Sequence, residues 1–386
     1  MVLSLAVYTV TAVVMAWLGW HVGQREQRVL AAGGGHLSMA SWEILASIVI
    51  YVVVSAFRWQ TSWDYNMYYN HYVAMQSLGE YSRENFEPGF SLIAHVMGKA
   101  GMHFAFYFAF WALVQIVLLY YALRRRKELL PWLALCIFLG PYYIFWMGFI
   151  RQSVVEAMFV VMVELIVRRK FWWYLLLSLV AVSIHKMCVL FIPLYLIPLI
   201  PVGKGKRWLP FALLGLCILL GSFPQWIRWM FDSLGQLAQV LGYGHYHRLF
   251  MSHDLEYAFR TVIGPARLLP LVSCLAMIWF YPGIRAMFGD DKYLPAIYRF
   301  SLVYMGYINL FANTTQYLAR PGELMRTCFV FMLCYLLCYL WRKRLWWAFA
   351  IIAISNFYYV YYEIAKSVII GGSIYMPELY HTFLFS

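Results

Sequence analysis

The sequence predicts an all-α membrane protein that crosses the bilayer many times. Of its 386 residues, 63% are hydrophobic and only 12% are charged. Uncharged apolar runs recur along the chain at about the 17 to 25 residues that a helix needs to span a bilayer. Short clusters of lysine and arginine separate these runs, which is the pattern of loops that set membrane orientation.

The apolar runs place about twelve membrane-spanning helices along the chain, within a range of roughly 11–14. The first run has no lysine or arginine before it and no small-residue cleavage site after it, so we expect a retained span. No internal repeat divides the chain, and residues 1–386 are predicted to form a single domain. The expected spans are 3–20, 39–57, 102–123, 130–147, 150–167, 171–185, 187–201, 209–222, 266–281, 294–314, 325–341 and 345–362.

The basic clusters all fall in loops on one side of the membrane if every expected span crosses. Loops rich in lysine and arginine stay in the cytoplasm, so this side is predicted to be cytoplasmic and both termini to lie outside. The same loops account for much of the net charge of +13, and we therefore expect no nucleic-acid partner. The clusters are Arg25 and Arg28; Arg124, Arg125, Arg126 and Lys127; Arg168, Arg169 and Lys170; Lys204, Lys206 and Arg207; Arg285 and Lys292; and Arg342, Lys343 and Arg344.

Neither the cysteines nor the histidines indicate a metal or cofactor site. The seven cysteines lie within or beside apolar runs without a CxxC pair, and we expect them to be inert core residues. His245, His247 and His253 with Asp254 have spacing that resembles metal ligands, but their loop is rich in glycine and tyrosine and offers no supporting shell. We therefore predict no metal and no cofactor.

Two longer segments are predicted on the outer side. The first outer loop spans residues 58–101, and within it residues 89–101 are too short to cross, so we expect a re-entrant or interfacial helix there. The second outer loop spans residues 222–265, and the spacing of its large apolar residues predicts a helix lying in the headgroup plane. Those residues are Trp226, Ile227, Met230, Leu234 and Leu237.

Polar residues also gather on the outer side, where orientation does not require them. An ionisable group near hydrocarbon costs about 2.5 to 3.5 kcal/mol, so several at one depth predict a shared cavity filled by water or ligand. The residues are Arg58, Asp64 and Glu87 in the first outer loop, Arg151 and Gln152 at the start of a span, His185 and Lys186 between two spans, and Arg320, Glu323 and Arg326 before another.

The outer arginines are candidate ligands for phosphate, because guanidinium binds phosphate oxygens in bidentate fashion and stays charged when partly desolvated. Arg151 is the strongest candidate, since it lies at a helix start where free backbone N–H groups also favour an anion. The alternative is that each arginine reaches lipid headgroups or pairs with a nearby carboxylate. The candidates are Arg58, Arg151, Arg320 and Arg326, and the carboxylates that would pair with them are Asp64, Glu87, Glu156 and Glu323.

Three outer residues are candidate general bases. We place His185 first, because an imidazole has an ordinary pKa of about 6.5, and then Asp64 and Glu87, whose carboxylates can take a proton from an incoming hydroxyl. The alternatives are a hydrogen-bonded core histidine and carboxylates paired with Arg58 or Arg83.

The outer segments are also rich in aromatic residues that could contact a sugar. Aromatic faces stack on sugar rings, although belts of tryptophan and tyrosine at the membrane interface are the alternative explanation. Tyr65 and Tyr68, with Gln152 and Lys186, are the candidate substrate-binding residues.

Short motifs in these segments resemble the EpsG-like branch of the Wzy polysaccharide polymerases. The resemblance extends over most of the chain, including Arg320 to Arg326 and a final P-E-L-Y. Ser62 and Trp63 depart from the family pattern, where a glycine commonly precedes the aspartate, and so do Met187 and Cys188, where small residues follow the histidine. The motifs are FR-x5-DY-x2-Y at 57–68, E-P-G-F at 87–90, F-I-R-Q at 149–152 and H-K at 185–186.

The resemblance implies a bacterial glycosyltransferase of the GT-C type in the inner membrane, with its active site facing the periplasm. Such enzymes join oligosaccharide repeat units carried on undecaprenyl pyrophosphate. From the outer arginines, which can neutralise a departing pyrophosphate, we expect the transfer to be inverting and independent of a metal. The implied partners are the lipid-linked donor and acceptor, membrane lipid and a chain-length-regulating co-polymerase of the Wzz type.

Two other functions remain open at this stage. An O-antigen ligase would use the same donor but deliver the glycan to lipid A core. A flippase or transporter of lipid-linked sugars would need no catalytic base, and for it we would expect polar residues at mid-membrane and on both sides with repeat symmetry. Here the candidate residues are on one side.

Overall fold

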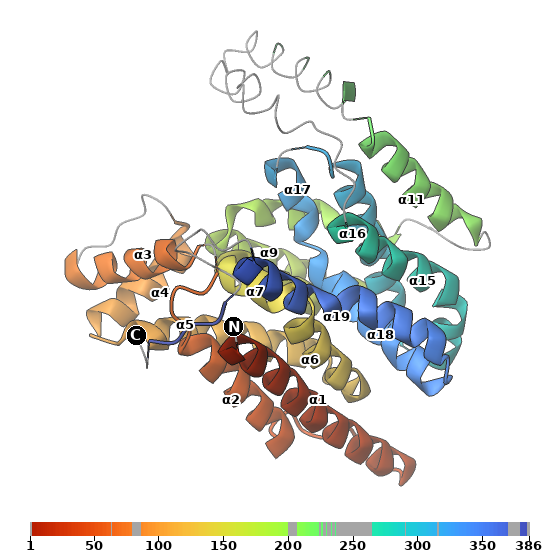
Figure 1. The fold of residues 1–386 in the computed structure, drawn as a ribbon, viewed down its shortest axis with the longest axis horizontal. Coiled ribbons are helices and arrows are strands. Elements are labelled where there is room, and N and C mark those ends of the chain that lie inside the picture. The colour runs from red at the N-terminus through yellow and green to blue at the C-terminus, as the bar shows by residue number, and fades with distance from the viewer. Residues whose placement is uncertain are drawn as a thin grey trace.

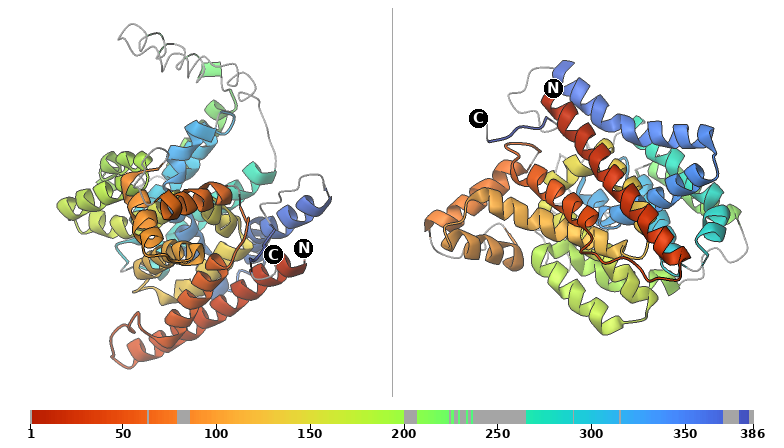
Figure 2. Two further views of the ribbon diagram at one scale, coloured as in Figure 1. Left: turned by 90° about the vertical axis from the view of Figure 1, so that its left-hand side faces the viewer. Right: turned by 90° about the horizontal axis from the view of Figure 1, so that it is seen from below.

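The computed structural model describes most of the chain, and in this part the protein is all-helical. The described residues form no strand, and one isolated antiparallel bridge joins Arg58 to Thr382. Both termini lie close together (Figures 1 and 2). The first helix and the C-terminal segment are joined by a hydrogen bond, in which the backbone N–H of Tyr380 donates to Ser4 Oγ at 3.0 Å. The residues described are 2–62, 64–78, 86–199, 207–223, 265–289, 291–314, 316–369 and 379–383, with 225, 226, 229, 233 and 236 as single positions.

The helices follow the expected spans closely along most of the sequence. They are α1 (Val2–Ala31), α2 (Trp42–Ala56), α3 (Tyr65–Leu78), α4 (Pro88–Lys99), α5 (Phe104–Ala122), η1 (Lys127–Leu129), α6 (Leu130–Leu139), α7 (Tyr142–Gly148), α8 (Ile150–Val167), α9 (Phe171–Ile184), η2 (Lys186–Leu190), α10 (Phe191–Leu194), η3 (Ile197–Leu199), α11 (Trp208–Gly221), α15 (Pro265–Met287), α16 (Leu294–Leu310), α17 (Gln316–Glu323), α18 (Arg326–Arg342) and α19 (Trp346–Ile369).

Among the residues described, three helices are long and apolar enough to cross a membrane on their own. They are α1, α5 and the Leu268–Met287 part of α15, and a fourth is obtained if α6 and α7, bent by 67° at their junction, count as one span. Several other expected spans do not meet this criterion. Some helices, such as α2, are too short, and others, such as α8 with Arg151, Glu156 and Glu164, carry too many charged residues. The described part of the chain is therefore that of an all-helical membrane protein, with three or four clear spans by this criterion.

The span expected over residues 187–201 is wrong as a single helix. The described part of this segment consists of the short elements η2, α10 and η3. Pro193 and Pro198 lack the N–H that a regular helix would use, and each ring crowds the preceding turn. Side chains from other helices satisfy carbonyl groups of this segment: Tyr174 donates to the Phe191 carbonyl and Arg299 donates to the Pro198 carbonyl.

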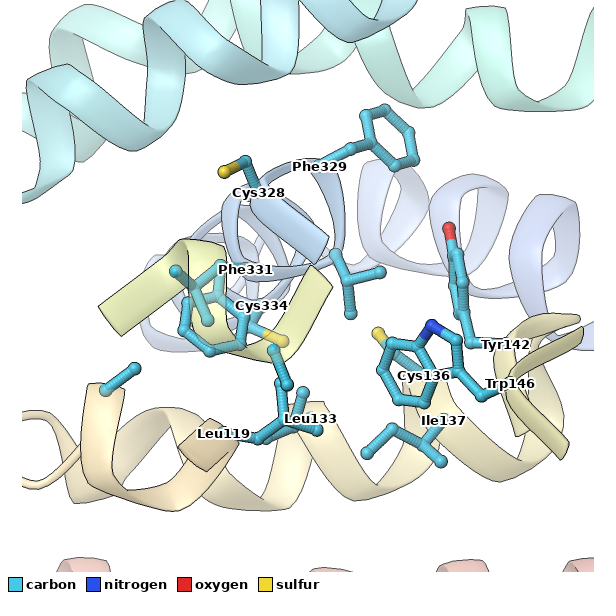
Figure 3. Close-up of a cluster of buried hydrophobic side chains, with 14 of the residues drawn as sticks. Leu119, Leu133, Cys136, Ile137, Tyr142, Trp146, Cys328, Phe329, Phe331 and Cys334 are labelled. Atoms are coloured by element: carbon cyan, nitrogen blue, oxygen red, sulfur yellow. The ribbon is translucent and has the colours of Figure 1, made fainter. Parts of the chain in front are cut away.

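Helix α18 forms the centre of the molecule. Nearly all of its residues are buried, and it contacts α6, α8, α15, α16 and α19. In Figure 3, Cys334 of α18 lies close to Cys136 of α6, whereas Phe329 points away from α6 and packs on Tyr304 of α16 at 5.6 Å. Because protein encloses this helix on all sides, it can carry Arg326 at its start without exposing a charge to lipid.

Helix α1 packs against η1 and α6 along a seam of small residues. A Cβ atom on Gly19 would lie 2.8 Å from the backbone N of Pro131, and one on Gly23 would lie 3.2 Å from Glu128 Cα. Glycines four residues apart allow helix backbones to approach this closely. The seam fixes the long first helix to the body of the protein (Figure 1).

Several basic clusters meet at one end of the bundle and are held there by buried acids. Lys127 binds Glu26 of α1 at 2.9 Å, and Arg124 binds Glu164 of α8 at 2.6 Å. Arg126 also forms an ion pair with Asp291, which lies between α15 and α16. These ion pairs bring the loop of Arg124–Lys127 and the loop of Asp291 together at one end of the bundle.

Candidate functional site

The first outer loop leaves α2 through a tight turn that the sequence did not reveal. Gln60 and Ser62 have φ angles of 48° and 85°, in the left-handed region that glycine adopts most readily. Ser62 is held in place because its hydroxyl donates to the Ile144 carbonyl at 3.0 Å. A glycine would fit this conformation without strain, which explains why serine is a departure from the family pattern here. The turn delivers Asp64 to the start of α3.

Helix α4 lies directly against the end of α9, and this contact positions Glu87. A Cβ atom on Gly89 would lie 2.5 Å from Ser183 Oγ and 2.8 Å from the Ser183 carbonyl oxygen. Glu87 precedes the helix at its N-cap, but its side chain makes no capping hydrogen bond. Its carboxylate reaches across to α8 and α9 instead.

The Glu87 carboxylate connects three of the predicted site residues. One oxygen, Oε2, forms an ion pair with Arg151. The other, Oε1, accepts a hydrogen bond from the backbone N–H of Lys186 at 3.0 Å and lies 3.5 Å from His185 Nδ1. Burial raises the pKa of this carboxyl, but the interactions with His185, the Lys186 N–H and Arg151 outweigh burial and lower the pKa to about 2. Glu87 is therefore a stable anion that holds the cluster together.

Arg151 lies in the first turn of α8 against aromatic rings from the first outer loop. Its guanidinium carbon is 4.6 Å from the centre of the Phe86 ring and 6.0 Å from that of Tyr68, so the rings favour the cation. The side chain is mostly buried, and its Nε has no hydrogen-bond partner within the part of the chain that the structure describes. Arg151 thus keeps one buried N–H group without a partner beside its ion pair with Glu87.

Asp64 and Arg320 face the same region. Burial raises the pKa of the Asp64 carboxyl, while the charges of Arg320 and Arg151 act against this increase. Both Asp64 and Arg320, which lies on α17, are half-buried. The structure therefore brings two predicted arginines, two predicted carboxylates and His185 to one end of the bundle.

A second polar network begins one residue further along α8. Gln152 donates to Glu156 and to Glu323, both at 3.0 Å, and Glu323 pairs with Arg326 at 2.9 Å. The predicted residues Gln152 and Arg326 are thus joined. Glu156 extends the network into the core, where it accepts hydrogen bonds from Trp146 at 3.1 Å and Thr327 at 3.3 Å.

Arg58 lies apart from both networks, in a buried position. Its guanidinium donates to the Ser55 carbonyl at 2.8 Å and to the Met147 carbonyl at 3.4 Å, and lies 4.6 Å from the centre of the Phe108 ring. Tyr65, which is also fully buried, stacks on Phe108 at 5.0 Å. In this structure Arg58 contacts α2 and α7 and Tyr65 contacts α5, and their predicted contacts with substrate remain predictions.

His71 is a site residue that the sequence analysis missed. It lies on α3 with its ring 4.1 Å from that of Phe86, and burial together with the Arg151 charge lowers its pKa to about 4. The positions of Tyr68 and His71, three residues apart, place both on one helical face. Recognising α3 as a helix would have identified this residue.

The described residues hold no group of three or more metal-ligating side chains. The segment with His245, His247, His253 and Asp254 lies outside the described residues, and so does most of the interfacial helix expected within 222–265. Helix α4 corresponds to the helix expected at 89–101.

The fold and the site define a helical membrane protein that gathers arginine, carboxylate and imidazole groups at one end of its bundle. The chain belongs to the EpsG family, because residues 42–377 match the model of that family. This membership confirms the resemblance seen in the motifs and indicates a polysaccharide-polymerase type of function. Searches among curated proteins and among solved structures each find no match to this chain.

Proposed function

We propose that this protein is a GT-C-type glycosyltransferase of about twelve spans that joins lipid-linked oligosaccharide repeat units on the periplasmic face of a bacterial inner membrane. Support comes from one observation above all: Arg151, Glu87 and His185 meet at the start of α8, with Asp64 and Arg320 facing the same region. The substrates are undecaprenyl-pyrophosphate-linked glycans, one as donor and one as acceptor.

The reaction is a single displacement. A base removes the proton of the acceptor hydroxyl, whose oxygen bonds to the anomeric carbon of the donor sugar with inversion. The bond from that carbon to the pyrophosphate oxygen breaks, and the lipid pyrophosphate leaves with the electron pair. Arg151, Arg320 and Arg326 neutralise this charge, so the leaving group needs no acid and no metal.

His185 is the proposed base, with Glu87 as the residue that positions it. The carboxylate of Glu87 lies 3.5 Å from Nδ1, and both ring nitrogens are buried without a hydrogen-bond partner among the described residues. A carboxylate on one side of an imidazole orients the other nitrogen toward a reacting hydroxyl. The low pKa of Glu87 makes it a poor base, and Asp64 is the second candidate because burial raises its pKa.

The lipid part of a substrate needs an apolar surface near this end. A groove of about 500 Å³ lies between α1 and α2 beside the C-terminal segment, lined by residues that include Val10, Val53, Phe57 and Tyr380. Tyr380 donates to the Val54 carbonyl of α2, and the nearby Thr382 bridges Arg58 at the start of the outer loop. We assign this groove to the isoprenoid tail of a substrate. We assign the exposed Lys186 and the region around Tyr68 to its sugars.

Gene deletion with gel analysis of the surface glycan distinguishes the three functions. Loss of a polymerase leaves single repeat units attached to lipid A, whereas loss of a ligase leaves core with no glycan. Loss of a flippase leaves no glycan on the periplasmic side and traps lipid-linked units in the cytoplasmic leaflet. Only the first result supports the proposal.

A purified-enzyme assay tests the chemistry. Lipid-linked repeat units are supplied in excess EDTA, and His185→Ala, Asp64→Asn and Glu87→Gln are compared. We expect wild-type activity to survive chelation and the His185 variant to lose about 10²- to 10⁴-fold. Activity lost on chelation contradicts the metal-free step, and full activity of His185→Ala transfers the base role to Asp64.

A further inference from the structure

A separate pocket opens at the other end of the bundle, where the basic loops meet. It has a volume of about 470 Å³ and lies between α1, the η1–α6 junction and the turn from α18 to α19. Its lining includes Trp20, Trp132, Trp341 and Trp346, together with Arg342 and Arg344. None of these residues belongs to the candidate active site, so the pocket is separate from it.

The four tryptophans form one connected cluster around Trp341. The ring of Trp341 lies 6.1 Å from that of Trp20, 5.7 Å from that of Trp132 and 5.0 Å from that of Trp346. Trp132 is buried, but Trp20, Trp341 and Trp346 remain 38–50% exposed. Partly exposed indoles at the end of a membrane helix bundle are typical of the headgroup level, where one face is apolar and the N–H is hydrated.

The polar lining is dominated by hydrogen-bond donors. Arg342 and Arg344 are both exposed, and Gln24 and Gln27 add amide groups from α1. Glu128 is the one acidic residue in the lining, and the Arg342 charge acts on it. Its neighbour Lys127 points elsewhere and is paired with Glu26. The pocket therefore presents two cations against one half-buried carboxyl, which favours an anionic ligand.

The turn that carries the two arginines is held in a fixed conformation. The backbone N–H of Leu345 donates to the Leu340 carbonyl at 3.0 Å, and Arg344 has a φ of 55°. On the other side, the close approach of Gly19 and Gly23 to the η1–α6 junction fixes α1. Both walls are thus preorganised, and binding costs little ordering of the protein.

We propose that this pocket binds an anionic phospholipid from the leaflet at the basic end, with its phosphate on Arg342 and Arg344. The glycerol and the upper acyl chain lie against the indole rings. Arginine pairs match phosphate oxygens, and basic pockets between membrane helices suit anionic headgroups. A lipid fits better than a soluble anion because Trp347 and Ile351, next along α19, are 66% and 49% exposed on the apolar surface.

Lipid binding to the purified protein tests this site. The protein is titrated with phosphatidylglycerol or phosphatidylcholine, and bound lipid is measured by native mass spectrometry and by the thermal unfolding midpoint. We expect phosphatidylglycerol to bind more tightly than phosphatidylcholine. The Arg342→Gln/Arg344→Gln variant should bind phosphatidylglycerol at least about tenfold more weakly, as expected for the loss of charge-assisted hydrogen bonds.

The matched control is Arg125→Gln/Arg169→Gln, which removes the same charge from exposed positions at this end outside the pocket lining. This control variant should bind phosphatidylglycerol as tightly as the wild type. The Glu128→Gln variant should bind phosphatidylglycerol more tightly than the wild type. Equal binding of both lipids, or an equal loss in the control, overturns the proposal. Displacement of the lipid by inorganic phosphate at the same concentration also overturns it, because it would identify a small-anion site.

Discussion

The geometry of the candidate site depends on one residue, Glu87. It joins α4 to α8 through Arg151 and to α9 through His185 and the Lys186 N–H. Arg151 and the His185–Lys186 pair come from different parts of the sequence, so one side chain sets the relative positions of the proposed base and the strongest anion ligand. Substitutions here should therefore affect geometry as well as charge.

Arg151 should be essential for polymerisation. We expect Arg151→Ala to abolish the glycan ladder while the protein still inserts and expresses, because the leaving pyrophosphate loses its nearest cation. Arg151→Lys should rescue only partly, since an ammonium group lacks the bidentate geometry of guanidinium. Gel analysis of surface glycan, with immunoblotting for protein level, measures both. A near-normal ladder in the Ala variant would contradict the assignment.

Glu87 should also contribute a pH-dependent part of the stability. Its pKa is lowered in the folded state from an ordinary value of 4.5 to about 2, so its contribution is present above pH 4.5 and lost as the pH falls toward 2. We expect Glu87→Gln to unfold at a lower temperature than the wild type at neutral pH. As the pH falls from 4.5 to about 2, the variant should lose less stability than the wild type. Thermal unfolding in detergent, measured across that range, tests this.

A suitable control for that measurement is Gln76→Glu, which adds a carboxyl at an exposed position of α3. It should leave the wild-type pH dependence in place. Parallel curves for wild type and Glu87→Gln would mean that the pKa of this carboxyl is the same in the folded and the unfolded protein.

The sequence predicted most of these residues because charged groups in an apolar chain are conspicuous. Position along the sequence and side of the membrane were enough to select Glu87, Arg151, His185 and Arg320. The same reasoning could not separate Arg58 from the others, because its carbonyl partners at Ser55 and Met147 come from tertiary packing. It also gave no reason to choose His71, whose role depends on a helix that was not predicted.

At the scale of helices, the contact between α4 and α9 controls the site. We expect Gly89→Ala to reduce activity strongly, because the added methyl group would lie 2.5 Å from Ser183 Oγ and 2.8 Å from its carbonyl oxygen. Relief of this clash moves Glu87 away from His185, and overpacking of this kind typically costs about 1–3 kcal/mol of stability. Glycan synthesis and the unfolding midpoint measure the two effects.

Gly215→Ala in α11 is the matched control, since a Cβ atom there would have no atom within 4 Å. Alanine favours helix over glycine, so this variant should keep its activity and be as stable as the wild type or slightly more so. Equal activity in the two variants would show that the α4–α9 contact does not position the site.

Helix boundaries were predictable where apolar runs were long and uninterrupted. Helices α8, α9 and α18 begin within one residue of the expected spans. The segment after His185 was not predictable in this way, because hydropathy detects apolar character but not the backbone donors removed by Pro193 and Pro198. Helix α3 was not predicted, because its sequence is rich in tyrosine and asparagine and contains no long apolar run.

For the whole molecule, the main feature is the separation of two charged ends. One end holds the Glu87–Arg151–His185 cluster, and the other holds the ion pairs of Arg124, Arg126 and Lys127. If the second end is cytoplasmic, a periplasmic reaction and binding of a cytoplasmic-leaflet lipid take place in different compartments.

Cysteine labelling should show that the two ends lie on opposite sides of the membrane. Asn70→Cys on α3 and Lys343→Cys in the α18–α19 turn each introduce a thiol at an exposed position. Six of the native cysteines are buried and Cys217 is half-buried, so the unmodified chain should give a low background. In intact spheroplasts, a membrane-impermeant maleimide should label the Asn70 variant, whereas the Lys343 variant should react only after lysis. The reverse pattern would place the candidate active site in the cytoplasm and contradict the periplasmic reaction, and labelling of both thiols before lysis would contradict the two-ended topology itself.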